Sequence, residues 1–460
     1  MFRFVNNEIL FTAFEVFSVT AVNCFIKFFL RIIIEYLAIF VPFILTVTVC
    51  NAFASIITPV LFTLSVIIFT VCLCSVSNYS WNPSLPAVIK SDAFIVPEVN
   101  RLYSNLMICV YVAILAVDFR IFPVRFAKTA LYGISLMDVG VGCFIAINAG
   151  LSPEVRKPML FDNTRGALKN SFTSCIPLLF MGIQRLVVVK GIDYHQQIIE
   201  YGVHWNFFFT LAFTKMFASL LCCFVKRSDL ILILAIVTGV IHQIFLICGI
   251  SSFIQNNDRN GIIAANKEGI FSLPGYVSLY LLFVAIGKYW RRVVLREKNA
   301  DHISSFVVEM PSVIIFTGLL TILSHVLIEK ISRREANLGY ICWITTLIIY
   351  LALTEHTFSL AVIYLIRLGV LDHNSTLFVG HSIVCAAIAK NPLIIFLIAN
   401  ILTGLVNITF HTMTFDAAGS LLILFVYTFI LSVFAVFLYI KNIKLRIPNN
   451  INIYNKFVYF

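Results

Sequence analysis

The chain contains 460 residues, of which 60% are hydrophobic and 12% are charged, and its mean hydropathy is +0.97. Soluble domains are roughly 45–50% apolar with about 25% charged residues, so this composition excludes a soluble globular protein. The net charge of +11 does not indicate a nucleic-acid-binding protein, because the basic residues lie in short loops between apolar runs.

Apolar runs of membrane-spanning length recur from one end of the chain to the other. A spanning helix needs about 20 apolar residues, and on this rule we predict about thirteen spans. They lie near residues 8–29, 34–52, 54–74, 104–119, 131–150, 168–189, 204–225, 229–251, 271–290, 312–330, 340–365, 391–409 and 418–440. The predicted fold is therefore an all-α, polytopic membrane helix bundle, with residues 1–460 forming a single transmembrane domain.

The distribution of basic residues predicts the orientation of these spans. If the N-terminus faces the lumen, the larger set of basic residues falls on the opposite side, including Arg156, Lys157, Arg291, Arg292 and Arg296. The positive-inside rule assigns that side to the cytosol. An odd number of spans then places the C-terminus in the cytosol.

The basic residues on the other face belong mostly to four dense polar motifs. These are DFRIFPVRFAK, the Lys190 to His204 stretch, ANKEGIFSLPGY and SRREANLGY. Polar groups at a membrane boundary are costly and point to function by default. We expect the four loops to build one lumen-facing site, whereas the alternative is that they only anchor the helices at the lipid headgroups.

Asp118 ends one apolar run, and Lys128 follows it across a segment that Pro123 prevents from continuing as a helix. The turn is predicted to bring Asp118 near Arg120, Arg125 and Lys128. A half-buried carboxylate beside cations can stay ionised and still accept a proton from an alcohol. A neighbouring cation can stabilise an oxyanion. The alternative is a helix-end ion pair that only neutralises the aspartate.

Two further residues are candidates for proton transfer or substrate positioning. Asp138 lies deeper in the sequence SLMDVGVGCF, where it either positions a polar substrate group or bonds a neighbouring helix. His204 is an alternative general base, because the usual pKa of its ring suits proton transfer near neutral pH. Glu200 can orient that ring if the segment is helical, since the two residues are four apart.

The remaining polar side chains of the segment from Gly182 to Phe213 are predicted to contact substrate. Arg185 and Lys190 suit a lipid phosphate, and Asn206 belongs to the same polar cluster. No Gly-x-Ser-x-Gly elbow indicates a serine nucleophile, so direct attack by an acceptor hydroxyl is the simpler chemistry. The twelve cysteines include no Cys-x-x-Cys pair, and we predict no metal site.

Several of these motifs together resemble a known enzyme family. AILAVDFRIFPVRFAKTALYGISLMDVGVG, RGALKNS, EYGVHWNFFFTLA, ANKEGIFSLPGY, SRREANLGYICW and LIANILTGLVNITF are similar to segments of the glucosaminyl-phosphatidylinositol inositol acyltransferases, called PIG-W in animals and GPI-anchored wall transfer protein in fungi. The resemblance runs from about residue 100 to residue 415. Val124, Ala130, Cys143 and Gly339 depart from the usual pattern, which affects no proposed catalytic residue.

The resemblance implies a multi-pass enzyme of the endoplasmic reticulum membrane that acts in GPI-anchor synthesis. It would transfer a fatty acyl group, typically palmitoyl, from acyl-CoA to the inositol ring of glucosaminyl-phosphatidylinositol. The family's leading catalytic candidates match Asp118 and Lys128. No metal or prosthetic group is implied, and acyl-CoA is a co-substrate.

Two other classes of function compete with an acyltransferase. A lipid or solute transporter, or a flippase, predicts intramembrane charges along a path and internal pseudo-symmetry, neither of which the sequence displays clearly. A non-catalytic scaffold leaves the clustering of Asp118, Lys128 and His204 without a purpose.

Overall fold

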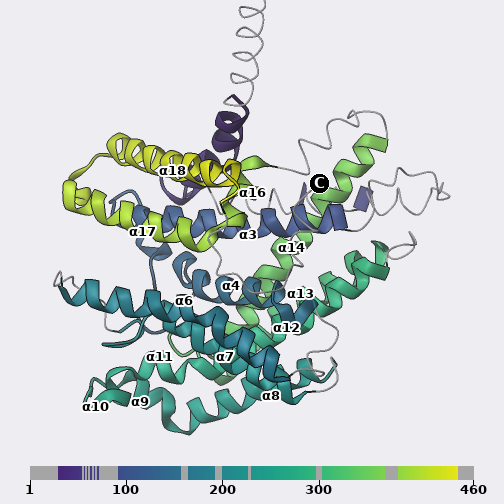
Figure 1. Ribbon diagram of the computed structural model, residues 1–460, viewed down its shortest axis with the longest axis vertical. Coiled ribbons are helices and arrows are strands. Elements are labelled where there is room, and N and C mark those ends of the chain that lie inside the picture. Colours follow the sequence, from purple (N-terminus) through teal and green to yellow (C-terminus); the bar gives the residue numbers. More distant parts are fainter. Residues whose placement is uncertain are drawn as a thin grey trace, which may run out of the picture. The chain divides into compact units, whose positions relative to one another are not determined.

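The computed structural model describes residues 30–53, 92–156, 164–191, 199–225, 229–296, 303–367 and 382–443, with isolated positions between 56 and 71 (Figure 1). Throughout this part of the chain the regular structure is helical, and no strand occurs. The longer helices are α3 (Asp92–Ala116), α4 (Leu136–Gly150), α6 (Thr164–Gly191), α7 (Phe207–Phe224), α8 (Leu230–Phe245), α12 (Leu273–Arg296), α13 (Ile303–Leu323), α14 (Leu338–Arg367), α17 (Pro392–Thr409) and α18 (Ala417–Ile440). The prediction of an all-α fold is confirmed.

Eight helical segments in the described part are long and apolar enough to cross a membrane. They are Leu30–Val47, Phe207–Phe224, Leu230–Gln255, Lys267–Arg292, Glu309–Ile328, Leu338–Phe358, Pro392–Thr409 and Ala417–Ile440, and each coincides with a predicted span. Two shorter apolar helices, Asn100–Ala116 and Leu136–Gly150, correspond to two more, and α6 covers the predicted span 168–189. The predicted span 8–29 lies outside the described residues, and 54–74 lies largely outside them.

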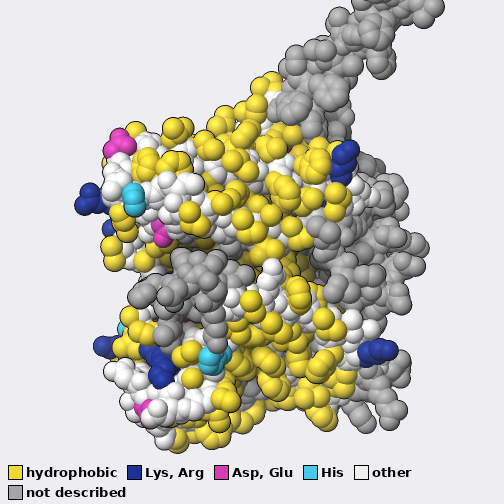
Figure 2. All heavy atoms as spheres, turned by 60° about the vertical axis from the view of Figure 1, so that its left-hand side comes forward, with side chains coloured by type: hydrophobic (Ala, Val, Ile, Leu, Met, Phe, Trp, Pro, Cys, Tyr) yellow, Lys and Arg dark blue, Asp and Glu magenta, His cyan; other side chains and the backbone are white. Residues whose placement is uncertain are grey.

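The lipid-facing character of these helices is visible in their exposed side chains. Ile236, Phe316 and Ile322 are each more than half exposed although they are strongly apolar. Figure 2 shows one face of the molecule, where hydrophobic side chains cover most of the described surface and charged ones are sparse. Such a surface is stable against hydrocarbon and unstable in water. The molecule is therefore a polytopic membrane helix bundle.

The chain forms two compact units. Unit 1 comprises Met1–Pro59, Met107–Pro123 and Leu377–Leu445. Within it α18 packs against α17 and against α16 (Ile383–Lys390). Tyrosine hydroxyls lock the helices by donating to backbone carbonyls, from Tyr427 to Tyr111 at 3.1 Å and from Tyr36 to Phe425 at 2.8 Å.

Unit 2 comprises Val60–Leu106, Val124–Thr376 and Arg446–Phe460. Helix α12 is its centre and packs against α4, α7 and α8, while α13 packs against α14. Helices α4 and α14 approach closely because Gly142 lacks a side chain, and a Cβ there would lie 2.6 Å from Ile344 Cγ1. The prediction that small residues behind Asp138 permit close helix approach is confirmed at this glycine.

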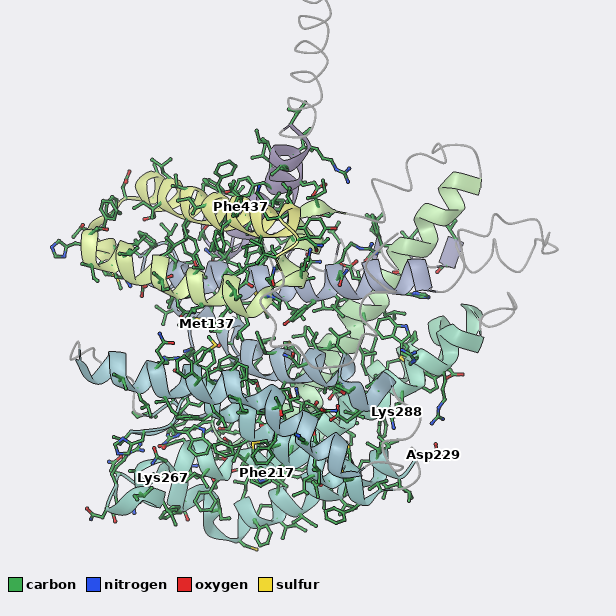
Figure 3. All side chains as sticks on the ribbon, in the orientation of Figure 1. Met137, Phe217, Asp229, Lys267, Lys288 and Phe437 are labelled. Carbon is green, nitrogen blue, oxygen red and sulfur yellow. The ribbon has the colours of Figure 1, made fainter. Side chains whose placement is uncertain are left out.

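Short elements of unit 2 gather at one of its ends. In Figure 3, Lys267 lies at this end, whereas Lys288 and Asp229 lie at the other. Figure 1 shows α9 (Ser251–Gln255), α10 (Gly261–Ala265) and α11 (Lys267–Phe271) there. The other short elements of the unit include η2 (Val124–Phe126) and the π-turn η4 (Leu246–Ile250), which joins α8 to α9. Gly249 allows α8 to turn into α9 there, because its φ of 127° is accessible to glycine.

Several predicted boundaries shift because polar side chains cap the helices. The span predicted from residue 204 begins at Phe207, because the Asn206 side chain accepts from the backbone N–H groups of Phe208 and Phe209. The span predicted from residue 131 begins at Leu136, where the Ser135 hydroxyl accepts from the Asp138 N–H. A prediction from hydropathy alone starts these helices too early, because it includes the capping residues in the helix.

Candidate functional site

The site in unit 2 is organised by one loop, Ser332–Asn337, whose three consecutive charged residues point to three different partners. Arg333, Arg334 and Glu335 are 4%, 7% and 2% exposed, so each is buried despite its charge. Ala336 follows with φ 49°, a left-handed conformation that is uncommon for a residue with a side chain. The backbone turn at Ala336 brings the loop close to α12, since a Cβ on Gly275 would lie 2.1 Å from the Ala336 carbonyl oxygen.

Arg333 forms the innermost ion pair, with Asp138. Its Nε lies 2.7 Å from Asp138 Oδ1. The other carboxylate oxygen accepts from the hydroxyls of Thr129 and Ser135 at 2.7 and 2.8 Å. Both oxygens of Asp138 are thus occupied by protein groups. Of the two predicted roles of Asp138, the geometry favours bonding a neighbouring element over positioning a substrate group.

Glu200 extends this ion pair toward the surface. Its carboxylate lies 2.8 Å from Lys128 Nζ and 3.5 Å from Arg333 Nη1. Burial alone would raise the pKa of Glu200, but the positive charges of Lys128 and Arg333 outweigh it, so the pKa is lowered. Lys128, Glu200, Arg333 and Asp138 therefore form a row of alternating charges, which we call the charge row, and its outer member Lys128 keeps 35% of its side chain exposed.

Lys128 is not paired as the sequence suggested. The prediction placed it beside Asp118, whereas the structure gives it Glu200 as its ion-pair partner. Asp118 belongs to unit 1 and Lys128 to unit 2, so their proximity stays a prediction. Glu200 lies in the loop before α7. The sequence pattern alone could not show whether Lys128 pairs with Asp118, which is close in the chain, or with Glu200, which is distant.

His204 lies at a bend in the non-helical segment between Tyr201 and α7. The condition under which Glu200 would orient its ring, a helix through both residues, is therefore not met, and Glu200 bonds Lys128 instead. The His204 backbone N–H donates to Asn266 Oδ1 at 2.7 Å, which ties this loop to the loop before α11. The side chain is exposed, and among the described residues its ring has no hydrogen-bond partner.

Asn206, Arg185 and Lys190 were predicted to contact substrate. Asn206 is buried, caps α7 and donates to the Gly182 carbonyl at 2.9 Å, so all its polar atoms serve the fold. Arg185 is exposed on α6, and its positive charge also lowers the pKa of Glu200. It therefore lies near the charge row. Lys190 is in the last turn of α6, and its side chain lies outside the described residues.

Asp118 occupies a different environment in unit 1. Its Oδ2 accepts from the Asn407 side-chain amide at 2.8 Å. Burial raises the pKa of Asp118, and the Asn407 hydrogen bond offsets this only in part. Arg120, in the same unit, is exposed and forms no ion pair with Asp118 among the described residues. The predicted partner Arg120 is thus replaced by Asn407, which sequence reasoning did not select because an amide carries no charge signal.

Arg125 lies beyond Asp118 in chain order, in η2 of unit 2. Its side chain is exposed, and the guanidinium lies 5.0 Å from the centre of the Phe126 ring. Its predicted contact with substrate stays a prediction.

A second ion-pair group joins α11 and the segment before α10 to the loop Ser332–Asn337. Arg259 holds the Glu268 carboxylate through two hydrogen bonds of 2.6 and 2.8 Å, and Arg334 contacts the same carboxylate at 2.7 Å. Sequence reasoning identified the motifs ANKEG and SRREAN but assigned no role to these residues. Their signal was the density of charge between apolar runs.

The contacts together connect the loops that the sequence placed on one face. Arg333 reaches Asp138 and Glu200, Arg334 reaches Glu268, and Glu200 reaches Lys128. Four polar segments, separated by up to about 200 residues of chain, thus meet within unit 2. Among the described residues no group of three or more His, Cys, Asp and Glu side chains is placed to hold a metal ion.

Comparison with known proteins gives the same family as the motifs. Residues 5–438 match the GWT1 family. The glucosaminyl-phosphatidylinositol-acyltransferase PIGW of Bos taurus is 36% identical over 353 residues, which are 69% of this chain and 68% of that protein. The phosphatidylinositol-glycan biosynthesis class W protein of Dictyostelium discoideum is 31% identical over 457 residues, 91% of this chain and 88% of that protein.

A fungal relative agrees with these two. GPI-anchored wall transfer protein 1 of Schizosaccharomyces pombe is 33% identical over 358 residues, covering 75% of this chain and 72% of that protein. The family match extends over nearly the whole chain, and the relatives exceed 30% identity over more than two thirds of it. The chain therefore belongs to the GWT1 family.

Proposed function

We propose that this chain is an acyltransferase of GPI-anchor biosynthesis that moves a fatty acyl group, of palmitoyl type, from acyl-CoA to an inositol hydroxyl of glucosaminyl-phosphatidylinositol. The names of its relatives support the acceptor and the pathway. The structural observation that carries the proposal is the charge row, which is buried at one end and exposed at Lys128. Such an arrangement holds a cation in place at a membrane boundary.

The proposed chemistry is direct attack of the inositol oxygen on the thioester carbonyl carbon. A base takes the hydroxyl proton as the carbon–oxygen bond forms, and the carbonyl oxygen gains negative charge. The tetrahedral intermediate then expels the CoA sulfur, which leaves as a thiolate and gains a proton. The products are the inositol ester and free CoA.

Each candidate residue fits one of these roles by its own surroundings. Asp118 suits the base, because its raised pKa makes the carboxylate a better proton acceptor, and the exposed His204 is the alternative. Lys128 suits stabilisation of the oxyanion. Candidate contacts to the lipid phosphate or headgroup are Arg120, Arg125, Arg185 and Lys190, with Asp138, Glu200 and Asn206 as supporting residues of the site.

Topology and location complete the proposal. The distribution of basic residues supports an N-terminus in the lumen and a C-terminus in the cytosol, with about thirteen spans in the endoplasmic reticulum membrane. The polar loops would then face the lumen. The whole of residues 1–460 acts as one acyltransferase domain that uses no metal or prosthetic group.

The test is acyl transfer by the purified protein. Incubation with acyl-CoA and glucosaminyl-phosphatidylinositol should add one acyl group to the lipid, read by mass spectrometry. Asp118→Ala and Lys128→Ala should each abolish the product while the protein remains folded, and Asp229→Asn, at an exposed ion pair with Arg292, serves as control. Normal turnover in both alanine variants would remove these residues from the mechanism. Transbilayer movement of the lipid without acylation would support a flippase instead.

A further inference from the structure

A second polar cluster shares the loop Ser332–Asn337 with the charge row. It is formed around two carboxyl groups, Glu329 and Glu335, which share the Ser251 hydroxyl at 3.0 and 2.8 Å. Gln243 Nε2 lies 2.9 Å from Glu329, and Gln255 Nε2 lies 3.1 Å from Glu335. These residues come from the end of α8, from α9 and from the loop between η6 (Ser324–Ile328) and α14.

The two carboxyl groups have no cation of their own. Neither forms an ion pair in the part of the chain that the structure describes, because Arg333 is directed to Asp138 and Arg334 to Glu268. Glu335 is 2% exposed, yet its Oε2 has no hydrogen-bond partner among the described residues. Burial raises the pKa of Glu335, and the nearby negative charge of Glu329 raises it further. A buried oxygen of this kind can accept a hydrogen bond from a bound ligand.

The outer side of the cluster is open to such a donor. Glu329, Ser251, Gln255 and Tyr132 are only half-buried. The Tyr132 hydroxyl contacts the Gln255 amide. Amide and hydroxyl groups both donate to and accept from sugar hydroxyls, and carboxylates accept from them, so the rim is chemically suited to a carbohydrate. The cluster also shares the loop Ser332–Asn337 with the charge row, so the two sites are adjacent in structure.

We propose that Glu329 and Glu335 bind the ammonium group of the acceptor's unacetylated glucosamine. This inference rests on the proposed function, in which glucosaminyl-phosphatidylinositol is the acceptor. A primary ammonium carries three N–H donors and one positive charge, which match two carboxylates and the unpartnered Glu335 oxygen. An N-acetyl group removes the charge and two of these donors and adds bulk. The pair therefore selects the amine form of the sugar.

The experiment compares binding and turnover of two lipids, glucosaminyl-phosphatidylinositol and its N-acetylated counterpart. The purified full-length protein in detergent is titrated with each lipid to obtain Kd, and acyl transfer from acyl-CoA gives KM and kcat. We expect the wild-type protein to prefer the amine lipid in Kd and KM. The Glu335→Gln variant should lose roughly 10- to 100-fold of this preference, the range of a charge-assisted hydrogen bond, with kcat less affected.

Two other variants keep the test decisive. Glu329→Gln changes a half-buried residue and is expected to fold even if the buried Glu335→Gln does not. Glu154→Gln removes a different buried carboxylate, one bonded to Ser219 at 2.7 Å, and should leave the ratio of the two Kd values unchanged. An unchanged ratio in both Glu329→Gln and Glu335→Gln overturns the inference, because the pair then only shares a proton within the fold. Absence of acyl transfer with a charge-dependent Kd ratio would instead overturn the proposed function and leave the amine site standing.

Discussion

Asp118 in unit 1 and Glu200 in unit 2 are both partly buried acidic residues outside the helices, and their surroundings move the pKa in opposite directions. The partner of Asp118 is a neutral amide, so burial dominates and the pKa rises. The partners of Glu200 are the cations Lys128 and Arg333, which outweigh burial and lower the pKa. Two carboxyl groups with divergent pKa values take different roles. Asp118 is suited to exchanging a proton, and Glu200 to remaining a permanent anion.

The largest expected effect is on turnover in Asp118→Asn. The substitution keeps an oxygen that can accept from the Asn407 amide, so the free energy of unfolding should change little. Loss of a general base reduces the rate by about 10²- to 10⁴-fold. The checks are initial rates of acyl transfer and thermal unfolding in detergent. A rate within a factor of two of wild type would assign the proton transfer to another residue, with His204 tested next.

Arg333→Met should give the largest loss of stability. The substitution leaves the buried carboxylate of Asp138 without its ion-pair partner and removes one cation from Glu200. Breaking a buried pair in this way costs about 3–5 kcal/mol. Arg292→Met, at the exposed pair with Asp229, should cost about 1 kcal/mol or less. Equal losses in the two variants would show that burial does not distinguish these ion pairs.

Asn407→Leu sharpens the contrast by removing the hydrogen bond that, within the described residues, holds the pKa of Asp118 down. The pKa of Asp118 should rise further, so the carboxylate ionises at higher pH. The acidic limb of the pH–rate profile is then expected to move to higher pH, with kcat at alkaline pH nearly unchanged. A limb that stays in place would mean that Asp118 does not control the rate.

The smallest expected effect is on the stability of the fold at acidic pH, to which the ionised Glu200 side chain contributes. Because the folded-state pKa is below the ordinary value of 4.5, ionised Glu200 stabilises the fold above that pH. This contribution is lost as the pH falls through the folded-state pKa. Unfolding temperatures between neutral and acidic pH should decline less in Glu200→Gln than in wild type. The same slope in both proteins would contradict the ionised state of Glu200.

Most of the fold could be predicted from hydropathy, whereas the partners in the site could not. Apolar runs such as 229–251 and 418–440 locate their helices because lipid requires continuous apolar helices. The segments that converge were also recognisable as dense polar motifs. The ion-pair partners were not recognisable: Lys128 was predicted beside Asp118, ten residues away, and the structure shows its ion pair with Glu200. The partner of each charged residue depends on how loops that are distant in the chain come together in the fold. The side-chain amide of Asn206 can either cap a helix or bind a substrate, and the sequence does not distinguish these roles.

The left-handed turn at Ala336 has a consequence for how this protein can vary. Three consecutive side chains, Arg333, Arg334 and Glu335, point to three different groups of partners. The close approach of the backbone to Gly275 fixes the directions in which these side chains point. Adding or deleting a single amino acid between Ser332 and Asn337 would rotate all three at once and separate two guanidinium groups from the carboxylates of Asp138, Glu200 and Glu268. Length in this hexapeptide is therefore constrained more tightly than the identity of any one member.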